Sequence, residues 1–191
     1  MSSSLTAAPS DAQRSDARLN TIPSLDGAPP LVTVRHLTKT YRGRPALRDL
    51  SLSLPAGRIV GLMGANGCGK TTLLKILAGV LADYEGQVRI AGHAPGPQSK
   101  ALVSFLPDAD FLATSLTPPR AIAQFSRLFA DFDAAKARRL VDFFALPAER
   151  SIKEMSKGMG EKLRIALMMS RRARVYLLDE PISGVDPAAR E

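Results

Sequence analysis

Two spacings of apolar residues divide the chain after residue 30 into predicted strands and helices. Leucines alternate with serines over residues 50–54, and this period of two predicts a strand with one apolar face. Short continuous apolar runs are typical of strands that are buried on both faces. We expect such runs to form strands near Leu31, over 59–63, at 88–90 between turns at Gly86 and Gly92, over 102–106 and over 175–178.

Helical spacing appears in two parts of the chain. One predicted helix follows a glycine-rich loop, carries apolar residues over 73–78 and ends at Gly79. Three more lie between Pro118 and Met169, the first of them with Ile122, Phe125, Leu128 and Phe129 on one face. Strands that flank a helical segment predict an α/β domain with a helical subdomain.

Residues 1–30 differ from the rest of the chain. They are rich in serine and proline, and they lack aromatic residues and the apolar stretch of a secretory signal. Because such a segment buries too little apolar surface to offset its ordering entropy, we expect a disordered tail.

Composition restricts the remaining possibilities. The 191 residues are 45% hydrophobic and 23% charged, which suits one globular domain. No apolar run approaches the ~20 residues that span a bilayer. The single cysteine, Cys68, excludes an intrachain disulfide. The net charge of +8 fits a solvated basic surface as well as an anionic ligand, nucleic acid or membrane, and the charge alone does not choose among them.

The most specific pattern is Gly-Ala-Asn-Gly-Cys-Gly-Lys-Thr over residues 64–71, which is typical of a phosphate-binding loop. Glycines let the backbone wrap closely around phosphate oxygens, and the following helix presents its positive end to the same anion. Lys70 can reach the β- and γ-phosphates, and the Thr71 hydroxyl can bind Mg²⁺. An ordinary glycine turn is the alternative interpretation.

A second pattern is the apolar strand that ends in Asp179 and Glu180. Two solvated carboxylates would be the simplest interpretation. With a phosphate loop upstream, however, Asp179 is expected to hold Mg²⁺, and Glu180 to orient or deprotonate the attacking water.

The third pattern is Met-Ser-Lys-Gly-Met over 155–159, which alone predicts a helix that begins near Ser156. Taken in order, the elements of residues 31–191 resemble the nucleotide-binding domain of ATP-binding cassette (ABC) proteins. Residues 64–72 resemble the family's Walker A loop, and residues 175–180 resemble its Walker B strand. Residues 156–159 resemble its signature motif, and residues 183–186 resemble its D-loop.

This resemblance implies a P-loop NTPase core of the ABC ATPase type, with an antiparallel β subdomain and a helical subdomain over about residues 107–172. It implies ATP hydrolysis with Mg²⁺, a head-to-tail pair of ABC domains, and a separate transmembrane permease. It also implies that this chain is cytoplasmic and lies peripherally at the inner face of the cell membrane. Nucleic acid is not expected as a partner. By the same resemblance, ATP contacts Tyr41, Gly64, Ala65, Asn66, Gly67, Cys68, Gly69, Lys70, Thr71 and Thr72 of one copy and Ser156 and Gly158 of the other.

Tyr41 would stack on adenine, although a structural tyrosine at a strand end is an alternative. Asp108 stands where the family usually has a glutamine, and it can serve the metal and the water. A surface aspartate in a turn is the other interpretation. Asp108 and the Ser-Lys-Gly-Met signature together resemble bacterial ABC-2-like exporters.

The family also has a histidine downstream of the D-loop, whereas His36 and His93 lie upstream of it. The sequence is therefore expected to be a fragment of a longer chain, with a truncated protein as the alternative. The chain as given is expected to bind nucleotide poorly or to hydrolyse it slowly. Two rival functions remain: a soluble ABC-type ATPase acting on ribosomes or nucleic acid, and a non-catalytic nucleotide-sensing regulator.

Overall fold

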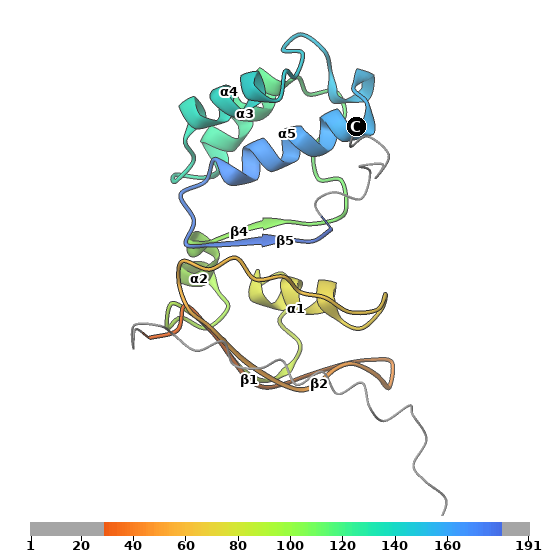
Figure 1. The fold of residues 1–191 in the computed structure, drawn as a ribbon, viewed down its shortest axis with the longest axis vertical. Coiled ribbons are helices and arrows are strands. Elements are labelled where there is room, and N and C mark those ends of the chain that lie inside the picture. The colour runs from red at the N-terminus through yellow and green to blue at the C-terminus, as the bar shows by residue number, and fades with distance from the viewer. Residues whose placement is uncertain (1–28, 181–191) are drawn as a thin grey trace, which may run out of the picture.

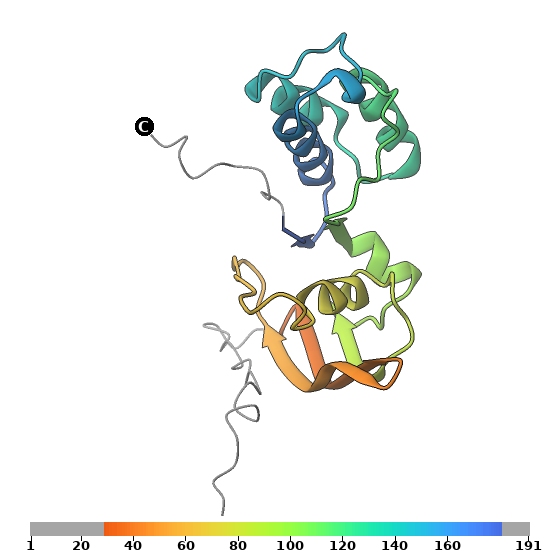
Figure 2. The same cartoon turned by 90° about the vertical axis from the view of Figure 1, so that its right-hand side faces the viewer.

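A computed structural model describes residues 29–180. Figures 1 and 2 show three parts. An antiparallel sheet and the helix packed on it lie at one end of the molecule, a parallel strand pair lies in the middle, and a group of helices lies at the other end. This arrangement confirms the predicted α/β fold with its antiparallel β and helical parts. The elements are β1 Val32–Tyr41, β2 Arg44–Leu54, α1 Lys70–Leu77, β3 Glu85–Ile90, α2 Pro97–Leu102, β4 Val103–Leu106, α3 Pro118–Leu128, α4 Ala134–Phe143, the 3-10 helix η2 Ile152–Glu154, α5 Lys157–Met169 and β5 Val175–Leu178.

The antiparallel sheet has the order β2-β1-β3. Val34 pairs with Leu52 on one side and with Val88 on the other, and all three side chains are buried. They belong to one hydrophobic cluster with α1, which contributes Leu73 and Ile76. The sheet and α1 therefore form one packed unit, which we call the sheet unit.

Strands β4 and β5 run parallel, with Val103 opposite Val175 and Leu106 opposite Leu178. The carboxyl ends of parallel strands meet at one edge of a sheet. This pairing therefore brings residues just after 106 and 178 to the same edge, and it positions the carboxylates described below.

Helices α3, α4 and α5 pack around a second hydrophobic cluster, which we call the helical unit. Arg171 joins it to the parallel strands. Its guanidinium makes two 3.1 Å contacts with Asp131, donates to the Val103 carbonyl at 2.7 Å and lies 4.3 Å from the Phe129 ring centre. The predicted bounds of the helical subdomain remain a prediction. Within residues 29–180, no helix combines the length and apolar character needed to cross a bilayer.

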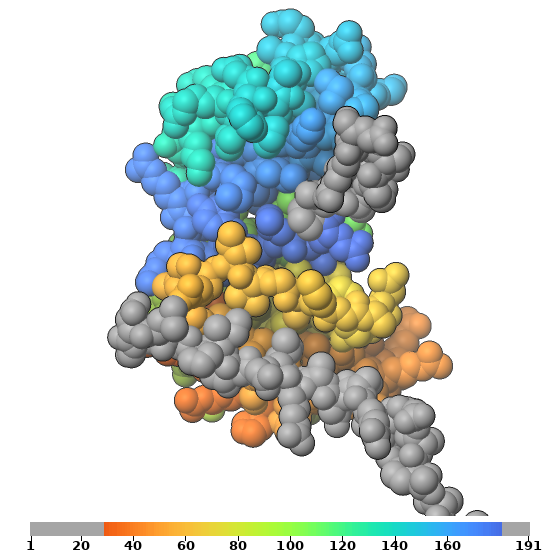
Figure 3. Space-filling view, in the orientation of Figure 1, coloured from red at the N-terminus to blue at the C-terminus, as the bar shows by residue number. Residues whose placement is uncertain are grey.

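The strand predicted over residues 59–63 is not formed. Ile59 and Met63 are 104% and 92% exposed, and Figure 3 shows this yellow-orange part of the chain at the surface beneath β5. A strand requires hydrogen bonds to a neighbour, and no strand of residues 29–180 pairs with this segment. Its apolar composition was therefore insufficient to predict its conformation.

Other differences are smaller. Gly86 lies inside β3 instead of in a turn; a Cβ there would come within 2.4 Å of the His36 carbonyl oxygen, so glycine lets the strands approach where their register shifts. Leu128 was expected on the buried face of its helix but is 63% exposed. The short helix α2 was not predicted. The expected tail falls mostly in residues 1–28, which lie outside the described residues, as does the D-loop.

Candidate functional site

The glycine-rich loop has the conformation that its composition predicts. Gly69 adopts a left-handed conformation with φ of 97° and forms the N-cap of α1. A Cβ at this position would lie 2.4 Å from the Ala46 carbonyl oxygen, so both the backbone angle and the available space favour glycine. The same close approach places the β1–β2 hairpin beside the loop. No side chain caps the first turn of α1.

The Lys70 side chain reaches back from the start of α1 into the loop. Its Nζ donates hydrogen bonds to the carbonyl oxygens of Gly64 at 2.9 Å and Ala65 at 3.0 Å, and it lies 3.9 Å from the Cys68 Sγ. Residues 64–68 are exposed, so the curled loop opens to solvent. A positive charge inside a ring of backbone groups at a helix start is an arrangement suited to a multiply charged anion.

A contact between distant parts of the sequence joins the loop to β5. The Thr71 hydroxyl donates to Asp179 Oδ1 at 3.1 Å. Asp179 is only 3% exposed, and its Oδ2 has no hydrogen-bond partner. An unpartnered buried carboxylate oxygen is costly unless a cation or a donor meets it. Thr71 and Asp179 therefore fit a hard cation such as Mg²⁺, which binds oxygen ligands.

Glu180 and Asp108 lie at the same edge. Together with Asp179 they line a small hollow of about 10 Å³, as expected for residues that follow two parallel strands. Glu180 is exposed and has a φ of 48°. Holding a non-glycine residue there costs about 1–3 kcal/mol, and such strain concentrates at functional sites. Among residues 29–180, no three His, Cys, Asp or Glu side chains form a metal-binding group. A site for Mg²⁺ needs fewer, because this ion keeps waters and phosphate oxygens as ligands.

Sequence reasoning missed two residues of this hollow, Glu161 and Arg164. Both come from α5, and Arg164 pairs with Asp110. They lie three positions apart on a helix whose other side is apolar, so helical periodicity could have identified them as polar residues on one face.

The predicted signature residues lie elsewhere. Ser156 is the N-cap of α5, and its Oγ accepts a hydrogen bond from the Met159 N–H at 3.3 Å. Gly158 has open space where a Cβ would lie. Within the described residues, no hydrogen bond or ion pair joins either residue to the phosphate loop. The structure therefore brings together the predicted residues of the loop and of β5, but not those of the signature motif.

Tyr41 ends β1 and is 45% exposed. One neighbour of its ring is Lys39, whose Nζ lies 4.9 Å from the ring centre. Lys39 is itself buried, with 5% exposure, and pairs with Asp83 at 2.7 Å. The aromatic side chain is thus supported by a fixed cation at the hairpin that lies beside the phosphate loop.

Comparison with known proteins gives a match over the part of the chain that contains the phosphate loop and β5. The profile of the ABC transporter family matches residues 47–183. The ABC transporter ATP-binding protein YtrB of Bacillus subtilis is 28% identical over 162 residues, which are 84% of this chain and 56% of that protein. The spermidine/putrescine import ATP-binding protein PotA of Legionella pneumophila strain Philadelphia 1 is 33% identical over 174 residues, which are 85% of this chain and 46% of that protein.

The chain thus spans about half the length of these two relatives. A solved structure described as the ATP-binding subunit of an ABC transporter superposes with a TM-score of 0.72 at 27% identity, covering 83% of this chain and 70% of that one. Sequence, motifs and architecture therefore agree.

Proposed function

The chain belongs to the ABC transporter family, and we propose from this premise that it binds and hydrolyses ATP to power a separate transmembrane permease. The observation that carries the proposal is the bond between Thr71 of the phosphate loop and the buried Asp179, whose second oxygen has no partner. Two segments 108 positions apart meet where a metal-bound triphosphate would need both.

Binding begins with the phosphate loop. The amides of the first turn of α1 lack a side-chain cap, so phosphate oxygens would accept their hydrogen bonds. Lys70 would exchange its bonds to the Gly64 and Ala65 carbonyls for bonds to the phosphates, which are stronger because both partners are charged. The remaining cradle consists of Asn66, Gly67, Cys68, Gly69 and Thr72.

Thr71, Asp179 and Asp108 are the residues that would hold Mg²⁺. When bound, this ion neutralises charge on the phosphates and polarises the bond that breaks. Glu180 would accept the proton of the attacking water, since its carboxylate lies at the same strand edge as Asp179. Glu180→Gln is expected to retain Mg-ATP binding and lose most turnover; unchanged turnover would remove Glu180 from this role.

A second copy would complete the site. Ser156 and Gly158 begin α5, a helix of 13 residues whose positive end favours an anion. Since the chain does not bring them to its own phosphate loop, they would contact the γ-phosphate held by the partner copy. Tyr41 would stack on adenine at the hairpin beside the loop.

Subunit complementation tests this arrangement. Lys70→Ala damages the phosphate loop, and Ser156→Ala damages the signature motif. A mixed pair of these variants contains one site with both motifs intact. The mixture is therefore expected to hydrolyse ATP faster than either variant alone, with Ser126→Ala as a control that damages neither motif. A mixture no more active than its components would contradict the proposal.

Export is the finer part of the proposal. Asp108 and the Ser-Lys-Gly-Met signature support it by their resemblance to ABC-2-like exporters, whereas the matched relatives include a protein named for import. Inside-out membrane vesicles that contain the permease should accumulate the transported compound when ATP is added. Release of a preloaded compound under the same conditions would instead indicate import.

A further inference from the structure

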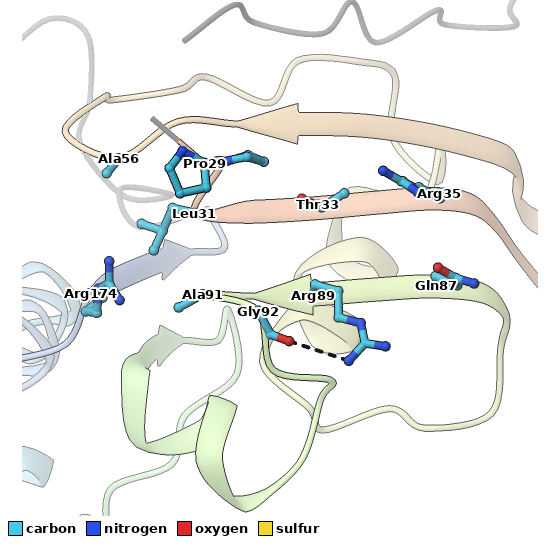
Figure 4. A pocket seen from close by; sticks show the side chains of 11 residues that line it. Pro29, Leu31, Thr33, Arg35, Ala56, Gln87, Arg89, Ala91, Gly92 and Arg174 are labelled. Carbon is cyan, nitrogen blue, oxygen red and sulfur yellow. Dashed lines mark hydrogen bonds between the residues drawn. The ribbon is translucent and has the colours of Figure 1, made fainter. Parts of the chain in front are cut away.

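A second hollow of the described residues lies on the antiparallel sheet, on the face turned away from α1 (Figure 4). Its volume is about 560 Å³, within the range of pockets that hold small molecules. Side chains alternate between the two faces of a strand. Val32 and Val34 are buried toward α1, so Thr33 and Arg35 face the hollow.

The sheet register builds a floor of hydrogen-bond donors. Thr33 pairs with Arg89 across β1 and β3, and Arg35 pairs with Gln87 two positions further along. All four side chains line the hollow. Arg89 is held toward one end by a 3.4 Å hydrogen bond to the Gly92 carbonyl, which Figure 4 shows.

A third arginine comes from outside the antiparallel sheet. Arg174 precedes β5 and lines the hollow beside Leu31, as Figure 4 shows. Its backbone N–H donates to the Leu102 carbonyl at 2.9 Å, which fixes its position at the start of the strand. The hollow therefore spans the junction between the antiparallel sheet and the parallel strands.

The charge around this hollow is unbalanced. Arg35, Arg89 and Arg174 are exposed, and the described residues that line the hollow include no aspartate or glutamate. None of the three forms an ion pair with a carboxylate of residues 29–180, whereas Lys39, Arg164 and Arg171 all do. Three uncompensated guanidinium groups around one hollow favour the binding of a multiply charged anion.

We propose that this hollow binds a small polyanion that carries phosphate groups. The planar guanidinium presents paired donors that match phosphate oxygens, and Thr33 and Gln87 add neutral donors. The site is separate from the phosphate loop, because α1 and the hollow lie on opposite faces of the same sheet. A ligand there would bridge β1, β3 and the start of β5, the strand that leads to Asp179.

Inorganic pyrophosphate is the probe, in magnesium-free buffer. The parent protein carries Lys70→Ala, which weakens the phosphate loop as a competing site. Calorimetry is expected to detect pyrophosphate binding to this parent. Each charged hydrogen bond contributes to affinity, so Arg35→Gln, Arg89→Gln and Arg174→Gln together should weaken binding about tenfold or more.

The matched control removes the same charge elsewhere. Arg120, Arg127 and Arg138 are exposed residues of α3 and α4, and their replacement by glutamine should leave the affinity unchanged. Arg89→Gln alone provides a milder variant if the triple variant unfolds, and it should also weaken binding. Equal weakening by both triple variants, or no binding to the parent, would overturn the proposal.

Discussion

The helices α1 and α5 both begin with backbone N–H groups that need hydrogen-bond acceptors, but their N-caps differ. Gly69 caps α1 without a side-chain hydrogen bond, whereas Ser156 caps α5 with its own hydroxyl. The first turn of α1 therefore has amides without a side-chain acceptor, and Asp179 lies beside it through Thr71. The difference is consistent with the proposal that α1 is the primary anion site and that α5 contacts the nucleotide of a second copy.

The two helices also belong to separate hydrophobic clusters, one in the sheet unit and one in the helical unit. Arg171 connects the helical unit to the parallel strands. Removal of one partner from a fully buried ion pair costs about 3–5 kcal/mol. Asp131, which Arg171→Met would leave without this partner, is 27% exposed, so we expect a cost at the lower end, about 3 kcal/mol. Arg171→Met is therefore expected to lower the free energy of unfolding by about that amount in denaturant titrations.

Arg172→Ala is the neighbouring control. Its contact with Asp133 is 3.6 Å long and its side chain is 78% exposed, so the expected loss is below about 1 kcal/mol. Equal losses for both variants would show that Arg171 does not hold the helical unit to the parallel strands.

A smaller effect is expected at the adenine end of the site. Lys39→Met removes the cation beside Tyr41 and leaves Asp83, which is exposed, in solvent. Because a cation–aromatic contact at an exposed site contributes about 0.5–1 kcal/mol, the affinity for ATP should fall about twofold to fivefold. The affinity for tripolyphosphate, which has no base, should not change. Equal loss for both ligands would mean that Lys39 supports the fold and not the tyrosine ring.

The smallest expected effect is on how the stability of the helical unit depends on pH. The backbone N–H of Lys136, followed by Arg172 and Arg139, holds the pKa of Asp133 below its usual value of 3.8. A lowered carboxyl pKa stabilises the fold above the unfolded-state value, and this stability is lost as the pH falls through the folded-state value. Asp133→Asn retains a cap that does not titrate. The variant should thus be less stable than the parent at pH 7 and closer to it at pH 3 in urea titrations. A difference that does not change with pH would contradict this origin.

Local chemistry explains what the sequence could predict. The glycines that permit the phosphate loop, the lysine within it and the carboxylates after an apolar strand are all specified by neighbouring residues. Their residue types therefore indicated their positions before the fold was known.

Features that depend on a neighbour in space were missed. Residues 59–63 have the composition of a strand but no pairing partner among residues 29–180. Arg171 meets Asp131 40 positions away, and Lys39 meets Asp83 44 positions away. No local pattern marks such pairs, because the fold alone decides which distant side chains meet.

The proposed function depends first on binding of the triphosphate by the loop over residues 64–72. Calorimetry with Mg-ATP should compare the parent with Lys70→Ala and Lys75→Ala, the latter removing an exposed lysine from the last turn of the same helix. Lys70→Ala should weaken binding about tenfold or more, and Lys75→Ala should leave it unchanged. Equal affinity of the two variants, or no affinity of the parent for Mg-ATP, would contradict this role of the loop.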